Sequence, residues 1–200
     1  MNPIWVSAAL IFVSVATPGP NNLLVLRQSM AHGIVSVAAP IASIVLGGGL
    51  LLAAALAGMG ALLERWPRLG GAVVAAGCGY LFWLGLRLAL RPQEAPEAGA
   101  APAAGRNGIG LFALQFANPK GWTLAIAVAG AWRAASAGGA MAALTPLLLF
   151  AALSGACLLG WALLGRLLAR ALQAPRTRRW FDRGMGVVLM LSAALLPFTP

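Results

Sequence analysis

Charged residues are scarce in this chain. Of its 200 residues, 9% are Asp, Glu, Lys or Arg, and only four are acids. A soluble domain usually carries about a quarter of its residues as charged side chains. Because 60% of the residues are hydrophobic and the mean hydropathy is +0.86, most of the chain must be solvated by lipid. The composition predicts an all-α integral membrane protein and argues against a soluble enzyme.

Reactive cysteines and metal-ligand clusters are also missing. The two cysteines, Cys78 and Cys157, lie inside apolar runs without CxxC spacing, so we interpret both as buried small hydrophobic residues. Hard cations need several oxygen ligands, commonly carboxylates, and the apolar runs contain none, so we expect no metal site and no cofactor. The acids all lie in expected loops or at a helix edge, at Glu64, Glu94, Glu97 and Asp182.

Six apolar segments are long enough, or nearly so, to cross a bilayer as helices. A bilayer core of about 30 Å takes about 20 helical residues. The residues before the first segment lack the positive charge of a cleaved signal peptide, so we expect this segment to be retained. The predicted helices are Pro3–Leu26, Ala38–Gly60, Leu69–Leu90, Ile109–Trp132, Met141–Leu164 and Gly184–Phe198.

The six segments fall into two groups of three. Between the groups lies 91–108, which is rich in Pro, Ala and Gly and is predicted to be a flexible cytoplasmic linker. We therefore expect two three-helix repeats, at 1–90 and 109–200. Since three is odd, the second repeat must enter the membrane upside down. Inverted repeats with paired broken helices are typical of secondary transporters, whose binding site lies at the repeat interface.

Three features of the two halves support this internal repeat. Each half begins with a helix that proline interrupts. The spacing between Gly33 and Pro40 recurs between Gly139 and Pro146. Small residues then follow in both halves, as Gly47-Gly48-Gly49 and as Ser154-Gly155.

Basic residues give the chain a net charge of +10 and predict its orientation. With both termini outside, the outside loops hold only Arg65, Arg68 and Arg133, as the positive-inside rule requires. We interpret the basic run Arg176–Arg179 as a cytoplasmic loop beside anionic lipid headgroups, and we expect no nucleic-acid partner. The residues then placed inside are Arg27, Arg87, Arg91, Arg106, Arg166, Arg170, Arg176, Arg178, Arg179 and Arg183.

The first predicted helix carries two prolines, Pro18 and Pro20, on either side of Gly19. Proline inside a helix removes a hydrogen bond and costs about 3 kcal/mol in a soluble helix. In lipid, such a break is tolerated only where it is buried in protein or lines a wet cavity. We therefore predict a functional break here, with Asn21 and Asn22 supplying amide donors and acceptors beside it.

The fourth predicted helix contains a second helix N-terminus in its interior. Asn118 suits the N-cap and Pro119 the first helical position, so the half-helix should present free amides and a positive dipole end. Lys120 lies about midway along Ile109–Trp132, too deep to reach the headgroups easily, and an intramembrane charge indicates a functional site. Gln115 lies on about the same face as Asn118.

These polar groups are expected to converge between the first and fourth helices. A cationic half-helix end suits a carboxylate, and amide oxygens with freed carbonyls suit an ammonium, so we hypothesise a zwitterionic amino acid as substrate. Tyr80 adds a hydroxyl to this cavity or is an ordinary packing tyrosine. Small residues at Gly77, Gly79 and Gly85 favour close helix packing, and such Gly-rich faces are compatible with a homodimer.

Three motifs resemble the LysE/RhtB family of amino-acid exporters, and the resemblance covers essentially the whole chain. It implies a multi-pass transporter in the bacterial cytoplasmic (inner) membrane that exports an amino acid or a derivative by proton antiport. The motifs are Thr17-Pro18-Gly19-Pro20-Asn21-Asn22-Leu23, Gly79-Tyr80-Leu81 followed by Leu84-Gly85, and Gln115-Phe116-Ala117-Asn118-Pro119-Lys120-Gly121.

One departure from that family concerns proton coupling. Many relatives carry Asp where this chain has Asn21, and the six segments hold no acid. The remaining candidates are Lys120, Asp182 and the amine of the substrate.

Three other functions stay open at this point. A thiol–disulfide relay needs paired cysteines at the helix breaks, and a metal-ion exporter needs carboxylates in the membrane. A structural or assembly protein without transport activity predicts that Lys120→Ala has no effect.

Overall fold

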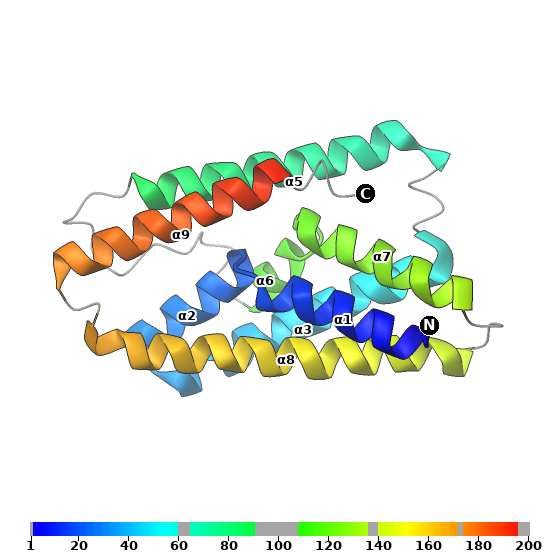
Figure 1. Cartoon of the computed structure of the whole chain (residues 1–200), viewed down its shortest axis with the longest axis horizontal. Coiled ribbons are helices and arrows are strands. Elements are labelled where there is room, and N and C mark those ends of the chain that lie inside the picture. The colour runs from blue at the N-terminus through cyan, green and yellow to red at the C-terminus, as the bar shows by residue number, and fades with distance from the viewer. Residues whose placement is uncertain (1, 60–64, 91–107, 136–139, 172–173, 196–200) are drawn as a thin grey trace.

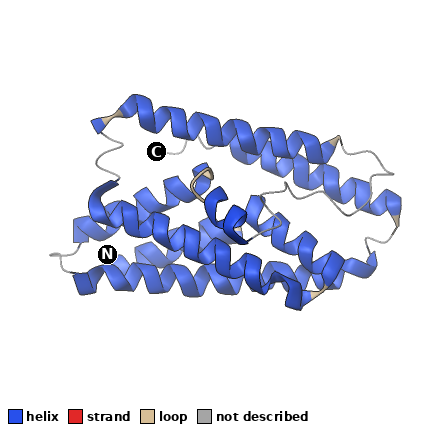
Figure 2. Cartoon of the chain, turned by 180° about the vertical axis from the view of Figure 1, so that it is seen from behind, coloured by secondary structure: helices blue, strands red, loops and turns tan. Residues whose placement is uncertain are grey.

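The computed structural model describes residues 2–59, 65–90, 108–135, 140–171 and 174–195. All the regular elements in these ranges are helices (Figure 2), which confirms the all-α prediction for this part of the chain. They are α1 (Pro3–Ala16), α2 (Pro20–His32), η1 (Ile34–Val37), α3 (Ala38–Ala54), η2 (Ala55–Met59), α5 (Pro67–Ala89), α6 (Gly108–Leu114), α7 (Pro119–Ala135), α8 (Ala140–Ala171) and α9 (Pro175–Leu195).

The helices run roughly along the long axis of the molecule (Figure 1). α5 and α9 lie side by side along one edge, α8 lies along the opposite edge, and the shorter helices fill the space between them. In Figure 1, α1 begins at the right-hand end of the molecule, and α9 runs from the left-hand end toward it. Figure 2 shows the molecule from behind, so the start of α1 is on the left there. The predicted linker, apart from Gly108, and three of the four acids (Glu64, Glu94 and Glu97) lie outside the described residues.

Two helical stretches are long and apolar enough to cross a membrane within the described ranges, Ile34–Gly58 and Leu144–Ala171. A third span arises if α1 and α2, bent by 53° at their junction, are counted as one. α5 contributes a shorter apolar stretch, Val74–Ala89. The prediction of six spans in two inverted repeats therefore remains a prediction.

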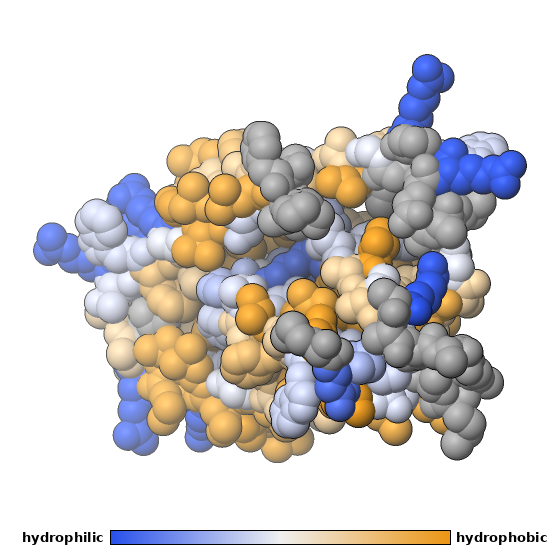
Figure 3. Space-filling model, turned by 45° about the vertical axis from the view of Figure 1, so that its right-hand side comes forward, coloured by the Kyte–Doolittle hydropathy of each residue, from blue (hydrophilic) through white to orange (hydrophobic). Residues whose placement is uncertain are grey.

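The outer faces are those of a protein that contacts lipid. Large apolar side chains point outward on several helices, including Trp5, Val35, Leu148 and Leu167. In Figure 3, hydrophobic residues cover much of the surface, and strongly hydrophilic side chains project mainly toward its left and right ends. A smaller hydrophilic area is recessed near the middle of this face.

The helix ends differ from the predicted ones where charge begins. α2 continues to His32 and α8 to Ala171, and α9 begins at Pro175 rather than at position 184. Hydropathy identifies the part of a helix that can lie in the hydrocarbon core. It does not identify the residue at which the helical hydrogen bonding ends. Two charged residues assigned to a loop or helix edge, Arg27 and Asp182, therefore lie within α2 and α9, where they form an ion pair.

Glycines allow two of the closest helix contacts, as expected for the third predicted helix. Gly85 of α5 lies against Gly186 of α9, where an added Cβ would be 2.6 Å from a backbone oxygen. Gly77 of α5 lies against the ring of Pro119. Gly79 differs, because it has open space beside it and packs against nothing.

Candidate functional site

The first helix is broken where the two prolines predict it. α1 ends at Ala16 and α2 begins at Pro20. Because Pro18 and Pro20 lack an amide N–H, the helical hydrogen-bond ladder cannot cross this junction. Thr17 adopts an extended conformation, and the chain turns by 53° between the two helices.

Side chains occupy most of the carbonyls that this break frees. The Asn22 side-chain amide donates to the carbonyls of Val15 (3.0 Å) and Thr17 (2.8 Å). The Thr17 hydroxyl bonds to the carbonyls of Val13 and Ser14, at 2.9 Å each. The expectation of bare carbonyls open to a ligand is therefore wrong, because the first turn of α2 folds its own donors back onto the end of α1.

The second break begins a new helix at Asn118, as predicted. α6 ends at Leu114, and α7 starts at Pro119 after a tight turn. The Asn118 side-chain oxygen accepts from the amide of Lys120 (3.2 Å), which is the expected N-cap. The amides of Gly121 and Trp122 donate to the Asn118 carbonyl. The predicted free amides are therefore not present, and the ammonium of Lys120 supplies the positive charge.

Lys120 connects the two breaks. Its ammonium donates to the carbonyl of Thr17 (3.0 Å) and to the hydroxyl of the same residue (2.7 Å). These oxygens lie at the C-terminal end of α1, where the helix dipole favours a cation. The side chain therefore points toward the end of α1 and lines the cavity.

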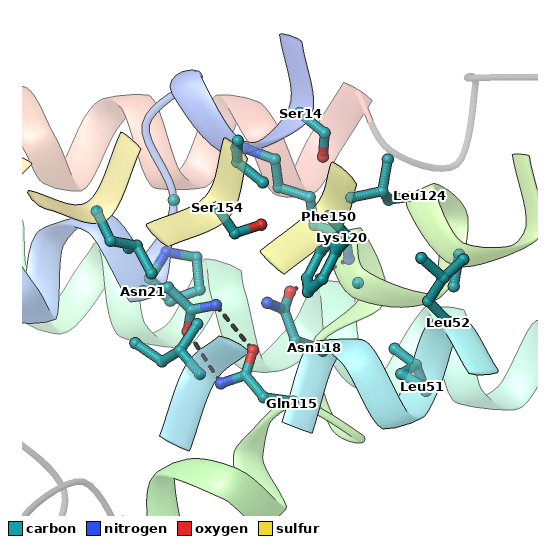
Figure 4. Close-up of a pocket in the computed structure, with 18 of the residues that line it drawn as sticks. Ser14, Asn21, Leu51, Leu52, Gln115, Asn118, Lys120, Leu124, Phe150 and Ser154 are labelled. Atoms are coloured by element: carbon teal, nitrogen blue, oxygen red, sulfur yellow. Dashed lines mark hydrogen bonds between the residues drawn. The ribbon is translucent and has the colours of Figure 1, made fainter. Parts of the chain in front are cut away.

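A pair of side-chain amides also joins the two breaks. Asn21 donates to Gln115 at 2.8 Å and accepts from it at 3.2 Å, and Figure 4 shows both bonds. Gln115 also donates to the carbonyl of Leu111. α3 passes Gln115 at Gly47, where an added Cβ would be 2.7 Å from the Gln115 Cγ.

A cavity of about 70 Å³ lies between these groups. On the same measure one water needs about 10–15 Å³, so the cavity has room for about five waters or a small solute. Seven of the ten predicted site residues line it, namely Gly19, Pro20, Asn21, Asn22, Gln115, Asn118 and Lys120.

The other three predicted site residues lie outside this lining. Pro18 sits in the break between α1 and α2, and Pro119 is buried against Gly77. Tyr80 is half-buried on α5, and its ring centre lies 6.0 Å from that of Trp83. The structure therefore agrees with the packing interpretation of Tyr80 and not with a hydroxyl that lines the cavity.

Sequence reasoning missed the walls that α3 and α8 supply. Their contributions recur at intervals of three or four residues, which places them on one face of each helix. The matched small residues of the two halves were the available signal, because Gly48 and Ser154 are two of these residues. The full set is Ile44, Gly48, Leu51 and Leu52 from α3 and Phe150, Ser154 and Leu158 from α8.

Among the described residues that line the cavity, Lys120 is the one that is charged. The Arg27–Asp182 pair and the free cysteines Cys78 and Cys157 lie outside the lining, and no metal-binding group of His, Cys, Asp or Glu occurs among the described residues. The cavity can therefore hold an anionic group at one point, neutral polar groups beside it and an apolar group against its walls.

Comparison with known proteins gives one family. The model of the LysE type translocator family matches residues 11–198. The leucine efflux protein of Enterobacter sp. (strain 638) is 32% identical over 103 residues, which are 50% of this chain and 49% of that protein. The cysteine/O-acetylserine efflux protein of Shigella flexneri is 32% identical over 124 residues, 60% of this chain and 61% of that protein. The alignments thus span about half of these relatives, and no solved structure matches.

Proposed function

Because this chain belongs to the LysE type translocator family of membrane transporters, we propose that it exports a neutral, zwitterionic amino acid across the bacterial inner membrane. The family contains transporters rather than enzymes, and its exporters reside in the inner membrane. Relatives of this chain are named as efflux proteins for leucine and for cysteine and O-acetylserine, all of which are neutral amino acids.

The observation that carries this proposal is the charge of the cavity. Lys120 gives it one positive charge, and the lining residues contain no carboxylate. A substrate carboxylate finds a cation there, whereas the side chain of lysine or arginine would place a second cation near Lys120 with no acid to neutralise it. Leu52, Leu124 and Phe150 offer an apolar wall to an uncharged side chain.

The same cavity supports the proposal of two inverted repeats. The α3 positions 44, 48 and 52 line it together with the α8 positions 150, 154 and 158. Corresponding members of these sets are separated by the same number of residues as Pro40 and Pro146. Two equivalent helix faces around one cavity are what a site at the interface of inverted repeats requires.

The proposed export is tested by measuring the efflux of different amino acids from cells. Cells with and without the protein are fed dipeptides that release one amino acid each, and the efflux of every amino acid is measured. We expect faster efflux of one or more neutral amino acids and no change for lysine and arginine. Faster efflux of a basic amino acid alone would contradict the charge argument.

We further propose that export is coupled to inward proton movement. Lys120 lines the cavity, Asp182 pairs with Arg27 outside it, and the substrate amine remains the third candidate carrier. In cells loaded with substrate, a protonophore should stop efflux against a concentration gradient. Uphill efflux that persists with the protonophore would exclude this coupling while leaving the export proposal intact.

The thiol–disulfide relay and the metal-ion exporter are not favoured. Cys78 and Cys157 lie on different helices, α5 and α8, neither belongs to a helix break, and neither lines the cavity. The cavity lining contains no carboxylate for a hard cation, and the ammonium of Lys120 would repel one.

A further inference from the structure

Ser154 carries a hydroxyl with no bonding partner in the described part of the protein. The residue is 2% exposed, lines the cavity from α8, and its Oγ has no hydrogen bond. Serine in a helix often bonds to the carbonyl four residues earlier, as Ser192 does with Val188 at 2.8 Å. A buried hydroxyl that lacks such a bond is costly, so its orientation requires an explanation.

Three of the other oxygens near the cavity already accept hydrogen bonds. The side-chain oxygen of Asn21 accepts from Gln115, and that of Asn118 accepts from the amide of Lys120. The carbonyl of Thr17 accepts from two side chains. The side-chain oxygens of Ser14 and Asn22 also belong to the lining, but among the described lining residues only the oxygen of Ser154 is fully buried without a hydrogen bond.

The ammonium of Lys120 retains one donor. A lysine ammonium has three N–H groups, and two of them point to the oxygens of Thr17. In Figure 4, Ser154 points from α8 toward the space between Asn21, Asn118 and Phe150, on the opposite side of that space from the Gln115 amide. Lys120, which has one N–H group that Thr17 does not accept, and Ser154, whose hydroxyl is unbonded, therefore line the same small cavity.

We propose that the Ser154 hydroxyl accepts a hydrogen bond from the α-ammonium of the substrate while Lys120 binds its carboxylate. This inference rests on the proposed function, since it names the group that recognises the amino end of the exported molecule. A neutral oxygen binds an ammonium without adding a negative charge to the membrane interior. It also makes Ser154 a specificity residue for substrates with a free α-amine.

The test compares two serine variants in export assays. Ser154→Ala removes the acceptor with little change in side-chain volume. Ser7→Ala is the matched control, because Ser7 is 0% exposed and its Oγ also has no partner among the described residues. Ser7 does not line the cavity. We expect Ser154→Ala to raise the half-saturating concentration (KM) about tenfold with a smaller change in maximal rate. Ser7→Ala should leave KM unchanged.

A second measurement uses the unmodified protein and does not depend on a variant that folds. A carboxylate with the same side chain but no amine should compete with the exported amino acid at least about tenfold less strongly than the amino acid itself. Equal competition by the two compounds would overturn the assignment. In Ser154→Ala, the difference between the two competitors should shrink.

The outcomes separate this inference from the proposed function. If the wild-type protein exports an amino acid but Ser154→Ala keeps its KM, the assignment of Ser154 is wrong and export stands. If Ser14→Ala raises KM and Ser154→Ala does not, the ammonium binds at the other serine that lines the cavity. If the wild-type protein exports no amino acid, the proposed function itself fails.

Discussion

The ammonium of Lys120 can be removed with little change in side-chain length. Lys120→Met keeps an unbranched side chain in the cavity but deletes the positive charge and both hydrogen bonds to Thr17. The Thr17 carbonyl keeps a donor, because Asn22 also bonds to it at 2.8 Å. We therefore expect the variant to fold, reach the membrane and lose affinity for substrate.

The expected loss follows from the one N–H group of the ammonium that Thr17 does not accept. A hydrogen bond to a charged group contributes about 1.5–3 kcal/mol. Since about 1.4 kcal/mol is tenfold in affinity, KM for the exported amino acid should rise by roughly 10- to 100-fold. The free energy of unfolding should change by less than this, because replacing a buried charge with an apolar side chain also removes its desolvation penalty.

Arg133 provides the matched control for this experiment. Its guanidinium donates to the carbonyl of Ala55 at the end of α3, so it too is a cation bound to a helix-end carbonyl, but it lies outside the cavity lining. Arg133→Met should therefore keep KM even if it lowers the thermal midpoint. A folded Lys120→Met protein with wild-type KM would refute the role of the ammonium in binding.

Two further predictions concern the packing around the site. Gly47→Ala should lower the thermal midpoint and impair export, because its Cβ would lie 2.7 Å from the Cγ of Gln115. Such overpacking costs about 1–3 kcal/mol. Gly49→Ala is the control, because Gly49 has open space beside it, and it should leave the thermal midpoint unchanged. Asp182→Leu should destabilise the detergent-solubilised protein by about 3 kcal/mol, because it breaks the buried ion pair with Arg27. The double variant with Arg27→Met should recover part of this loss, with KM unchanged in both. A double variant that is no more stable than the single one would contradict the pairing argument.

The two breaks could be predicted because their causes are local. A single proline is not enough, since Pro146 lies inside the continuous helix α8. The two prolines around Gly19 and the Asn118-Pro119 helix start are stronger signals, and neither needs any knowledge of neighbouring helices. The N-cap at Asn118 is equally local, since its side-chain oxygen bonds to an amide two residues later.

The partners of the freed groups could not be predicted in this way. Which side chain reaches the Thr17 carbonyl depends on how the two halves pack, and Lys120 lies 103 positions away in sequence. The contact of Ser154 with the cavity could not be predicted either, because the sequence around it does not distinguish it from any other small residue on an apolar helix. Hydropathy also made these helices too short, because the charged turns at the end of α2 and at the start of α9 continue as helix beyond the apolar core.

The two breaks complement each other chemically. The break after α1 leaves an excess of acceptors, because Pro18 and Pro20 remove donors and leave carbonyls. The second break adds one cationic donor, because the ammonium of Lys120 bonds to both oxygens of Thr17. Without the first break this ammonium would lose both acceptors, and an unpaired charge in the membrane interior is costly. If a substrate carboxylate binds Lys120 as proposed, it competes with the oxygens of Thr17 for the same ammonium and so acts on the bond that joins the two breaks.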